Sequence, residues 1–164
     1  MTIDADRIRK TALLHAPLER VWHAISDAQQ FGTWFGAELD GPFVAGTRLS
    51  GRIVPTQVDA DVATMQEPYA GTKFVVFVER VEPMRLLSFR WHPYAVDAKD
   101  YATEPTTLVE FELAATPEGT RLTVTESGFD GIPLERRAQA FASNEQGWVH
   151  QLALVAKYLT RPAW

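Results

Sequence analysis

The sequence contains no cysteine in 164 residues. This absence excludes disulfide bonds, thiolate nucleophiles and zinc sites built on cysteine ligands. The chain also has no run approaching the roughly 18 consecutive apolar residues that a membrane-spanning helix needs, so we expect no membrane insertion. Residues 1–15 lack the uninterrupted apolar segment of a secretory signal peptide. A cytoplasmic location is therefore the default expectation.

Positive charge is also scarce. The 16 Lys and Arg residues are outnumbered by 21 Asp and Glu residues, which leaves a net charge of -5. Because neutralising phosphates needs a basic face, this balance argues against a nucleic-acid partner. The scattered histidines have no metal-ligand spacing, and P-loop, nucleophile-elbow and dinucleotide signatures are missing. We assign no metal, no cofactor and no catalytic residue, and expect a monomer or a weak dimer.

The hydrophobic patterning predicts one domain over residues 1–164, with its core over about 8–160. A strand is expected over 8–15, followed by two short helices, the second of which begins at Asp27 and ends near Gly32 or Trp34. Glycines then punctuate two short strands over 37–40 and 47–54. Residues 55–73 are polar and contain Pro55, Pro68 and Gly71, and we interpret them as a long, mobile loop of the kind used for lids and binding elements.

Alternating apolar residues dominate the second half of the chain. Strands are expected over 74–81 and 85–92, and residues 107–115 show the clearest half-buried alternation. A polar connection is expected over 93–105, and a hairpin turn at 117–119 leads into a strand with Leu122 and Val124 inward. From Leu134 onward, apolar residues recur at steps of three and four, which predicts a helix of about 25 residues stopped by Pro162.

This order of elements predicts an α+β fold. Consecutive antiparallel strands bury one face of their sheet, and the terminal helix is the large apolar element left to cover that face. We expect a curved antiparallel sheet of about six or seven strands, two short helices after the first strand, and the long C-terminal helix packed across the sheet.

Several short motifs resemble those of one superfamily. They are HAPLERVW at 15–22 followed by Trp34-Phe35, Glu82-Pro83 followed by FRW at 89–91, TTLVEFE at 106–112, GTRL at 119–122, ESGF at 126–129, and Asn144 with Gly147-Trp148. In this order and spacing the chain resembles the SRPBCC superfamily (START-like, Bet v 1-like), and within it the domain named for the activator of the heat-shock-protein-90 ATPase. The resemblance covers residues 8 to about 160.

The resemblance implies a helix-grip fold with an internal pocket for a small hydrophobic molecule. Because fold alone does not set function, three functions stay open. The first is binding of a hydrophobic ligand between the sheet and the terminal helix. The second is a chaperone-linked interaction domain involved in stress response, with a chaperone as partner. The third is an enzyme similar to a polyketide cyclase or aromatase, for which Glu126, Glu145 and Arg137 offer acid–base groups.

Candidate pocket residues come from the inward strand faces, from the apolar stripe of the last helix, and from Trp34-Phe35, which with the 55–73 segment either cap a ligand at the pocket mouth or cover the end of the core. They are Trp34, Phe35, Phe89, Trp91, Phe111, Phe141, Glu145, Trp148 and Leu152. Trp148 is either a pocket wall or core packing, and the helix-breaking Gly147 before it predicts a close backbone approach.

Two carboxylates share these inward faces. Glu145 lies on the apolar stripe, where it is either a polar anchor for a ligand or a residue at the edge of the stripe, in solvent or paired with an arginine. Glu126 shares the inward phase of its strand but is expected to meet solvent at the strand end. Arg90 and His92 are expected to point outward.

Overall fold

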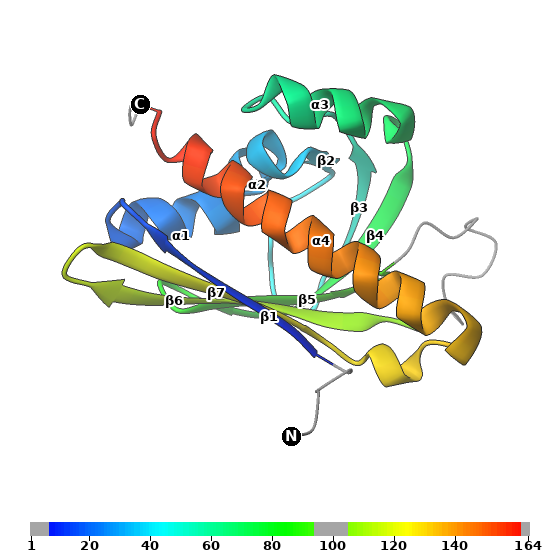
Figure 1. The fold of residues 1–164 in the computed structure, drawn as a ribbon. Coiled ribbons are helices and arrows are strands. Elements are labelled where there is room, and N and C mark those ends of the chain that lie inside the picture. Colours follow the sequence, from blue (N-terminus) through cyan, green and yellow to red (C-terminus); the bar gives the residue numbers. More distant parts are fainter. Residues whose placement is uncertain (1–6, 94–104, 162–164) are drawn as a thin grey trace.

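A seven-stranded sheet wrapped around one long helix dominates the computed structural model, which describes residues 7–93 and 105–161 (Figure 1). The first half of the chain contains β1 (Arg7–Leu14), α1 (Leu18–Ser26), α2 (Ala28–Phe35), β2 (Ala37–Leu39), β3 (Arg48–Ile53), α3 (Ala60–Gln66) and the 3-10 turn η1 (Glu67–Tyr69). The second half contains β4 (Lys73–Glu82), β5 (Leu86–Trp91), β6 (Thr107–Thr116), β7 (Gly119–Ser127), the turn η3 (Phe129–Gly131) and α4 (Leu134–Tyr158).

The sheet is antiparallel throughout. Its strand order is β1-β7-β6-β5-β4-β3-β2, so neighbours in sequence pair as hairpins and β1 closes onto β7. α4 crosses the concave face, with α1 and α2 beside its C-terminal half (Figure 1). This arrangement confirms the predicted α+β class, the sheet of six or seven strands and the helix laid across it.

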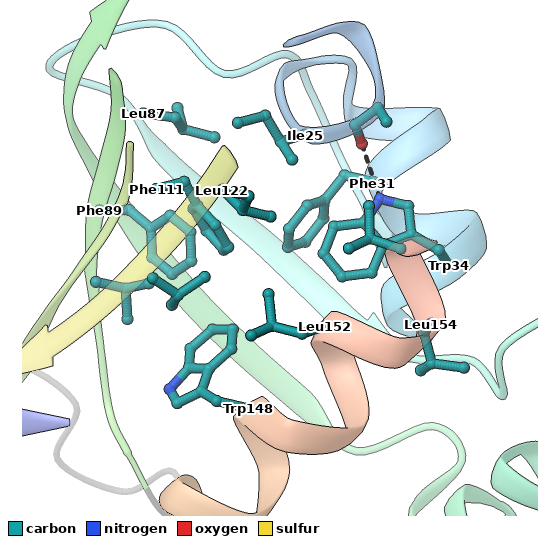
Figure 2. Close-up of a cluster of buried hydrophobic side chains, with 14 of the residues drawn as sticks. Ile25, Phe31, Trp34, Leu87, Phe89, Phe111, Leu122, Trp148, Leu152 and Leu154 are labelled. Carbon is teal, nitrogen blue, oxygen red and sulfur yellow. Dashed lines mark hydrogen bonds between the residues drawn. The ribbon is translucent and has the colours of Figure 1, made fainter. Parts of the chain in front are cut away.

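The interface between α4 and the sheet is packed with large side chains. Phe89, Phe111, Leu122 and Val124 project from the strands and are all almost fully buried. Trp148 and Leu152 approach them from α4, and Trp34 closes the cluster from α2 (Figure 2). These side chains interdigitate, so the centre of the interface is closely packed.

The two short helices meet at Asp27. Its backbone ends α1, and its carboxylate caps α2 by accepting hydrogen bonds from the Gln29 and Gln30 amides. α2 ends at Gly36, whose φ of +94° is accessible to glycine at little cost. The ring of Phe35, in the last turn of α2, stacks on Phe31 at 4.6 Å between centroids and lies 6.3 Å from the Trp148 ring of α4.

The prediction of a mobile loop over 55–73 is wrong. The segment contains α3 and η1, and Asp59 caps α3 by accepting from the Asp61 and Val62 amides. Asp59 also pairs with Lys157 of α4 at 3.1 Å. Gln66 donates to the Phe35 carbonyl and accepts from the Thr56 amide, which docks α3 on the end of α2. A polar helix held by caps and tertiary hydrogen bonds lacks the apolar stripe that periodicity detects.

α4 has the 25 residues predicted from its periodicity. The predicted stop at Pro162 and nearly all of the predicted 93–105 connection lie outside the described residues. Among the helices of the described part of the chain, none is both long and apolar enough to cross a membrane.

Candidate ligand-binding site

An open cavity of about 240 Å³ lies where the ends of β3, β4 and β5 meet α2 and α4. Its walls are mostly apolar, with a few polar groups among them. The lining residues are Phe35, Ile53, Thr72, Lys73, Phe74, Val75, Trp91, His92, Pro93 and Asn144.

A second cavity of about 80 Å³ shares three of these walls, namely Phe35, Trp91 and Asn144. Gly147, Trp148 and Gln151 of α4 complete it. We call the two cavities together the tryptophan pocket, because Trp91 and Trp148 stand side by side in it.

Aromatic rings form the inner wall of the tryptophan pocket. The indoles of Trp91 and Trp148 stack with 5.7 Å between centroids and 26° between planes. The Phe35 ring lies tilted against both indoles, with centroid distances of 6.0 Å to Trp91 and 6.3 Å to Trp148. Such a wall offers flat apolar surface, which suits a planar hydrophobic ligand.

A buried carboxylate holds this wall from behind. Glu126 is completely buried, and it accepts hydrogen bonds from four side chains. Trp148 Nε1 donates to Oε1 at 2.8 Å, and Trp91 Nε1 donates to Oε2 at 2.9 Å. Thr107 donates to Oε2 at 2.5 Å, and Asn144 Nδ2 donates to both oxygens at 2.9 and 3.0 Å.

The backbone explains why these five residues meet. Glu126 faces inward near the end of β7, opposite Val109 of β6, and Thr107 lies two residues along on the same face. Trp91 is the last residue of β5 and pairs with Thr107. Asn144 and Trp148 are four residues apart in α4, so they project from one side of the helix. The carboxylate therefore joins three strands to α4.

A buried carboxylate is costly unless its oxygens are saturated with hydrogen bonds. Here both oxygens of Glu126 are saturated by neutral donors of the described residues. Its carboxylate thus fixes the orientation of both indoles and of the Asn144 amide. With its oxygens engaged in this way, Glu126 is placed to position other groups rather than to exchange protons with a ligand.

The predicted pocket residues separate into two groups. Phe35, Trp91 and Trp148 line the tryptophan pocket. Trp34, Phe89, Phe111 and Leu152 lie in the packed core, where the Trp34 indole donates to the Ala24 carbonyl at 2.8 Å (Figure 2).

Two further predicted residues lie away from the tryptophan pocket. Phe141 is half-buried and packs edge-on against Phe129. Glu145 lies at the surface with 48% of its side chain exposed, 3.7 Å from Lys10. It therefore sits at the edge of the helical stripe, which was one of the alternatives, and its partner is a lysine rather than an arginine.

Two expectations about single residues are wrong. Glu126 is buried rather than solvated, because α4 covers its strand end. No close backbone approach explains Gly147, since a Cβ added there would meet no atom within 4 Å. His92 lines the open end of the cavity, and its ring packs edge-on against Phe77, which pairs with the outward-facing Arg90, so its outward orientation stays a prediction. Arg90 does point outward and pairs with Glu79 at 2.8 Å.

The acid–base groups considered for an enzyme are not gathered at one place. Arg137 donates to the carbonyls of Asp130 and Ile132, where it fastens the turn before α4. Glu145 is engaged at the surface and Glu126 behind the indoles. In the described part of the chain, no group of three or more His, Asp or Glu side chains is arranged to hold a metal ion.

Sequence reasoning missed Asn144, Gln151, Ile53 and Phe74 as pocket residues. The spacing of Asn144 and Trp148 was a usable signal, because a polar residue four positions before an inward tryptophan shares its helix face. Phe74 and Ile53 gave no such signal, since strand alternation does not tell an open end of a sheet from its packed centre.

Comparison with known proteins gives a family and a set of related folds. Residues 15–160 match the family model described as "Activator of Hsp90 ATPase homolog 1-like protein". The comparison with curated proteins finds no match.

Solved structures share the fold at low sequence identity. Protein MLL2253 from Mesorhizobium loti is 23% identical, with a TM-score of 0.71 over 96% of this chain and 99% of that chain. A protein from Arthrobacter aurescens is 17% identical, with a TM-score of 0.71 over 99% and 91%. DynU16, from the dynemicin biosynthetic locus, is 27% identical with a TM-score of 0.66, and 94% of this chain covers 47% of that longer chain.

Proposed function

The chain belongs to the family of activator of Hsp90 ATPase homolog 1-like proteins, and we propose that it binds a small, flat, hydrophobic ligand in the tryptophan pocket. The membership confirms the resemblance found in the sequence. The single observation that carries the proposal is the aromatic wall, in which Trp91 and Trp148 are stacked and both anchored to Glu126.

Local energetics support a binding role for this wall. Gly147 lies inside α4, where a glycine costs about 1 kcal/mol relative to alanine. Since no neighbour would obstruct a side chain there, packing does not explain the glycine. The missing side chain leaves room in the smaller cavity beside Trp148, and that room is useful to a ligand.

The size of the cavity limits the ligand. Pockets for drug-sized molecules have volumes of roughly 300–1,000 Å³. The larger cavity has a volume of about 240 Å³, which suits a molecule of one or two rings. Binding is favoured over catalysis because Glu126, the acidic group behind the pocket, is engaged in structural hydrogen bonds, and Glu145 lies at the surface away from the pocket. Cytoplasmic location and a monomeric or weakly dimeric state stay predictions.

NMR spectroscopy of the indole N–H groups tests the proposal. Titration with 2-naphthylmethanol, a neutral two-ring probe, is expected to shift the indole signals of Trp91 and Trp148. The Trp34 indole is an internal control, because it donates to the Ala24 carbonyl within the core. Shifts that are absent from Trp91 and Trp148 across several flat probes would refute the proposal.

A pair of glycine variants makes the test specific. Gly147→Leu adds a side chain at the wall of the smaller cavity, where its Cβ would meet no atom within 4 Å, and is expected to weaken probe binding at least tenfold. Gly131→Ala is the matched control, because a Cβ there also meets no atom within 4 Å but Gly131 lies in η3, outside the pocket lining. Equal affinities in the two variants would contradict the placement of the ligand.

A second candidate function is a chaperone-linked interaction, favoured by the description of the family. Met65 and Tyr69 expose 58% and 57% of their surface on α3 and η1, where a partner protein could contact them. Adding the protein to the chaperone of its host and measuring the ATPase rate tests this function. A rate unchanged by saturating protein would exclude it.

A further inference from the structure

A buried carboxylate and two side-chain amide oxygens lie around the indole wall, and from them we infer that the tryptophan pocket selects ligands that carry a cationic hydrogen-bond donor, such as a primary ammonium group beside an aromatic ring. This inference rests on the proposed binding function and adds the charge of the ligand. Three features carry it, namely Glu126, Asn144 and Gln151.

The first feature is the buried carboxylate of Glu126. Its hydrogen bonds from the described residues come from indoles, a hydroxyl and an amide, all of which are neutral. The carboxylate lies one side chain behind the pocket surface, because Trp91 and Asn144 touch both the cavity and Glu126. At an effective dielectric constant of about 20, a negative unit charge roughly 8 Å away changes the affinity of a charged ligand more than tenfold. It strengthens the binding of a cation and weakens the binding of an anion.

The second feature is the orientation of the Asn144 amide. A carboxylate accepts hydrogen bonds but has none to donate, so Asn144 must turn its Nδ2 toward Glu126. The amide oxygen then points away from the carboxylate. Because Asn144 lines both cavities, its amide offers the ligand an acceptor.

The third feature is a buried acceptor on Gln151. Its Nε2 donates to the Phe35 carbonyl at 3.1 Å, which fixes the amide. Its Oε1 is buried and accepts no hydrogen bond within the described part of the chain. A buried acceptor without a donor is unfavourable by about 1–3 kcal/mol, so a ligand N–H placed in the smaller cavity would remove that penalty.

The indoles add to the same preference. Each donates its N–H to a carboxylate oxygen, which pushes electron density toward the ring. Electron-rich ring faces attract cations that approach within about 6 Å of their centroids. Lys73 at the cavity wall opposes the preference for cations. However, Lys73 is exposed, so solvent screens its charge more strongly than it screens the buried charge of Glu126.

Three matched probes test the inference by isothermal titration at pH 7. They are 2-naphthylmethylammonium, 2-naphthylmethanol and 2-naphthoate, which share their rings and differ in charge. We expect the ammonium probe to bind at least tenfold tighter than the carboxylate probe, with the alcohol between them. The ranking should persist in 0.5 M NaCl, because salt screens the net surface charge but not a buried one.

Two variants locate the source of the selectivity. Glu126→Gln is expected to reduce the ratio of ammonium to carboxylate affinity at least fivefold. Glu145→Gln is the control, because it removes the same charge from the exposed side of α4 and should leave the ratio unchanged. Gln151→Met should weaken the ammonium probe several-fold by removing the buried acceptor.

The outcomes separate the inference from the proposed function. If none of the three probes binds, the binding function itself fails. If all bind alike, or the carboxylate probe binds best, the pocket binds ligands but the inference on charge is overturned. If the Glu126→Gln variant does not fold, the inference on charge is still tested by the ranking of the three probes in the wild-type protein and by the persistence of that ranking in 0.5 M NaCl.

Discussion

Replacing Glu126 with leucine tests whether the buried carboxylate organises this end of the fold. Leucine has a similar size but no acceptor, so four side chains lose their hydrogen-bond partner: Trp91, Thr107, Asn144 and Trp148. A buried donor left without a partner is unfavourable by about 1–3 kcal/mol. The two donors that are themselves buried, Thr107 and Trp148, set a loss of about 2–6 kcal/mol, and the half-buried Trp91 and Asn144 add less.

Part of this loss is offset. Removing the carboxylate also removes the free energy needed to take a charge out of water, a penalty of several kcal/mol before hydrogen bonds repay it. Removing one member of a buried charged network lowers stability by about 3–5 kcal/mol in measured cases. We therefore expect Glu126→Leu to lower the free energy of unfolding by about 3 kcal/mol, a large part of the roughly 5–15 kcal/mol of a typical domain.

Urea unfolding followed by circular dichroism measures the change. The midpoint should fall while the slope stays constant, because both proteins expose the same surface on unfolding. Glu145→Leu is the matched control on the exposed face of α4, and its stability should stay within about 0.5 kcal/mol of wild type. A Glu126→Leu protein as stable as wild type would refute the reasoning, since an apolar end of the core would then serve equally well.

Three further predictions concern single contacts. Thr107→Val should lower the free energy of unfolding by about 2 kcal/mol, since it removes a hydrogen bond to a charged group; an unchanged urea midpoint would contradict this. Gly147→Ala should raise the free energy of unfolding by about 0.5–1 kcal/mol, because a helix-favouring methyl group enters open space, and a lower melting temperature would show a hidden clash. Asp59 has a pKa below its ordinary value of 3.8, because the Val62 amide and then the Lys157 ammonium hydrogen-bond to its carboxylate. Asp59→Asn should therefore destabilise the protein at pH 6, and its difference from wild type should shrink as the pH falls below 3.8; a difference that stays constant down to pH 2 would exclude the ionic contribution.

The secondary structure could largely be predicted because local patterns encode it. Alternation over 107–115 and the three- and four-residue steps from Leu134 onward correspond to β6 and α4. α3 escaped prediction, because its stability comes from the Asp59 cap and from the Gln66 and Lys157 contacts. These partners lie on α2 and α4, and no local pattern announces them.

The candidate site could be predicted only in part. Inward phase alone placed Trp91 and Trp148 among the pocket residues, but it placed Phe89 and Phe111 there equally. What separates the two sets is whether another ring fills the facing space. That depends on the crossing position of α4 over the sheet, which is set by all the contacts at once.

The sequence by itself determined the order of the elements, the face that each strand buries and the long helix that covers the sheet. These follow from periodicities of two and 3.6 residues, which act over short stretches of chain. Only the tertiary structure decided that Glu126 is buried and Glu145 exposed, although both share an inward or apolar phase. The reason is geometric: α4 covers the end of β7 and presents Asn144 and Trp148 to one carboxylate, whereas the other lies at the edge of the helix face, where Lys10 and solvent reach it.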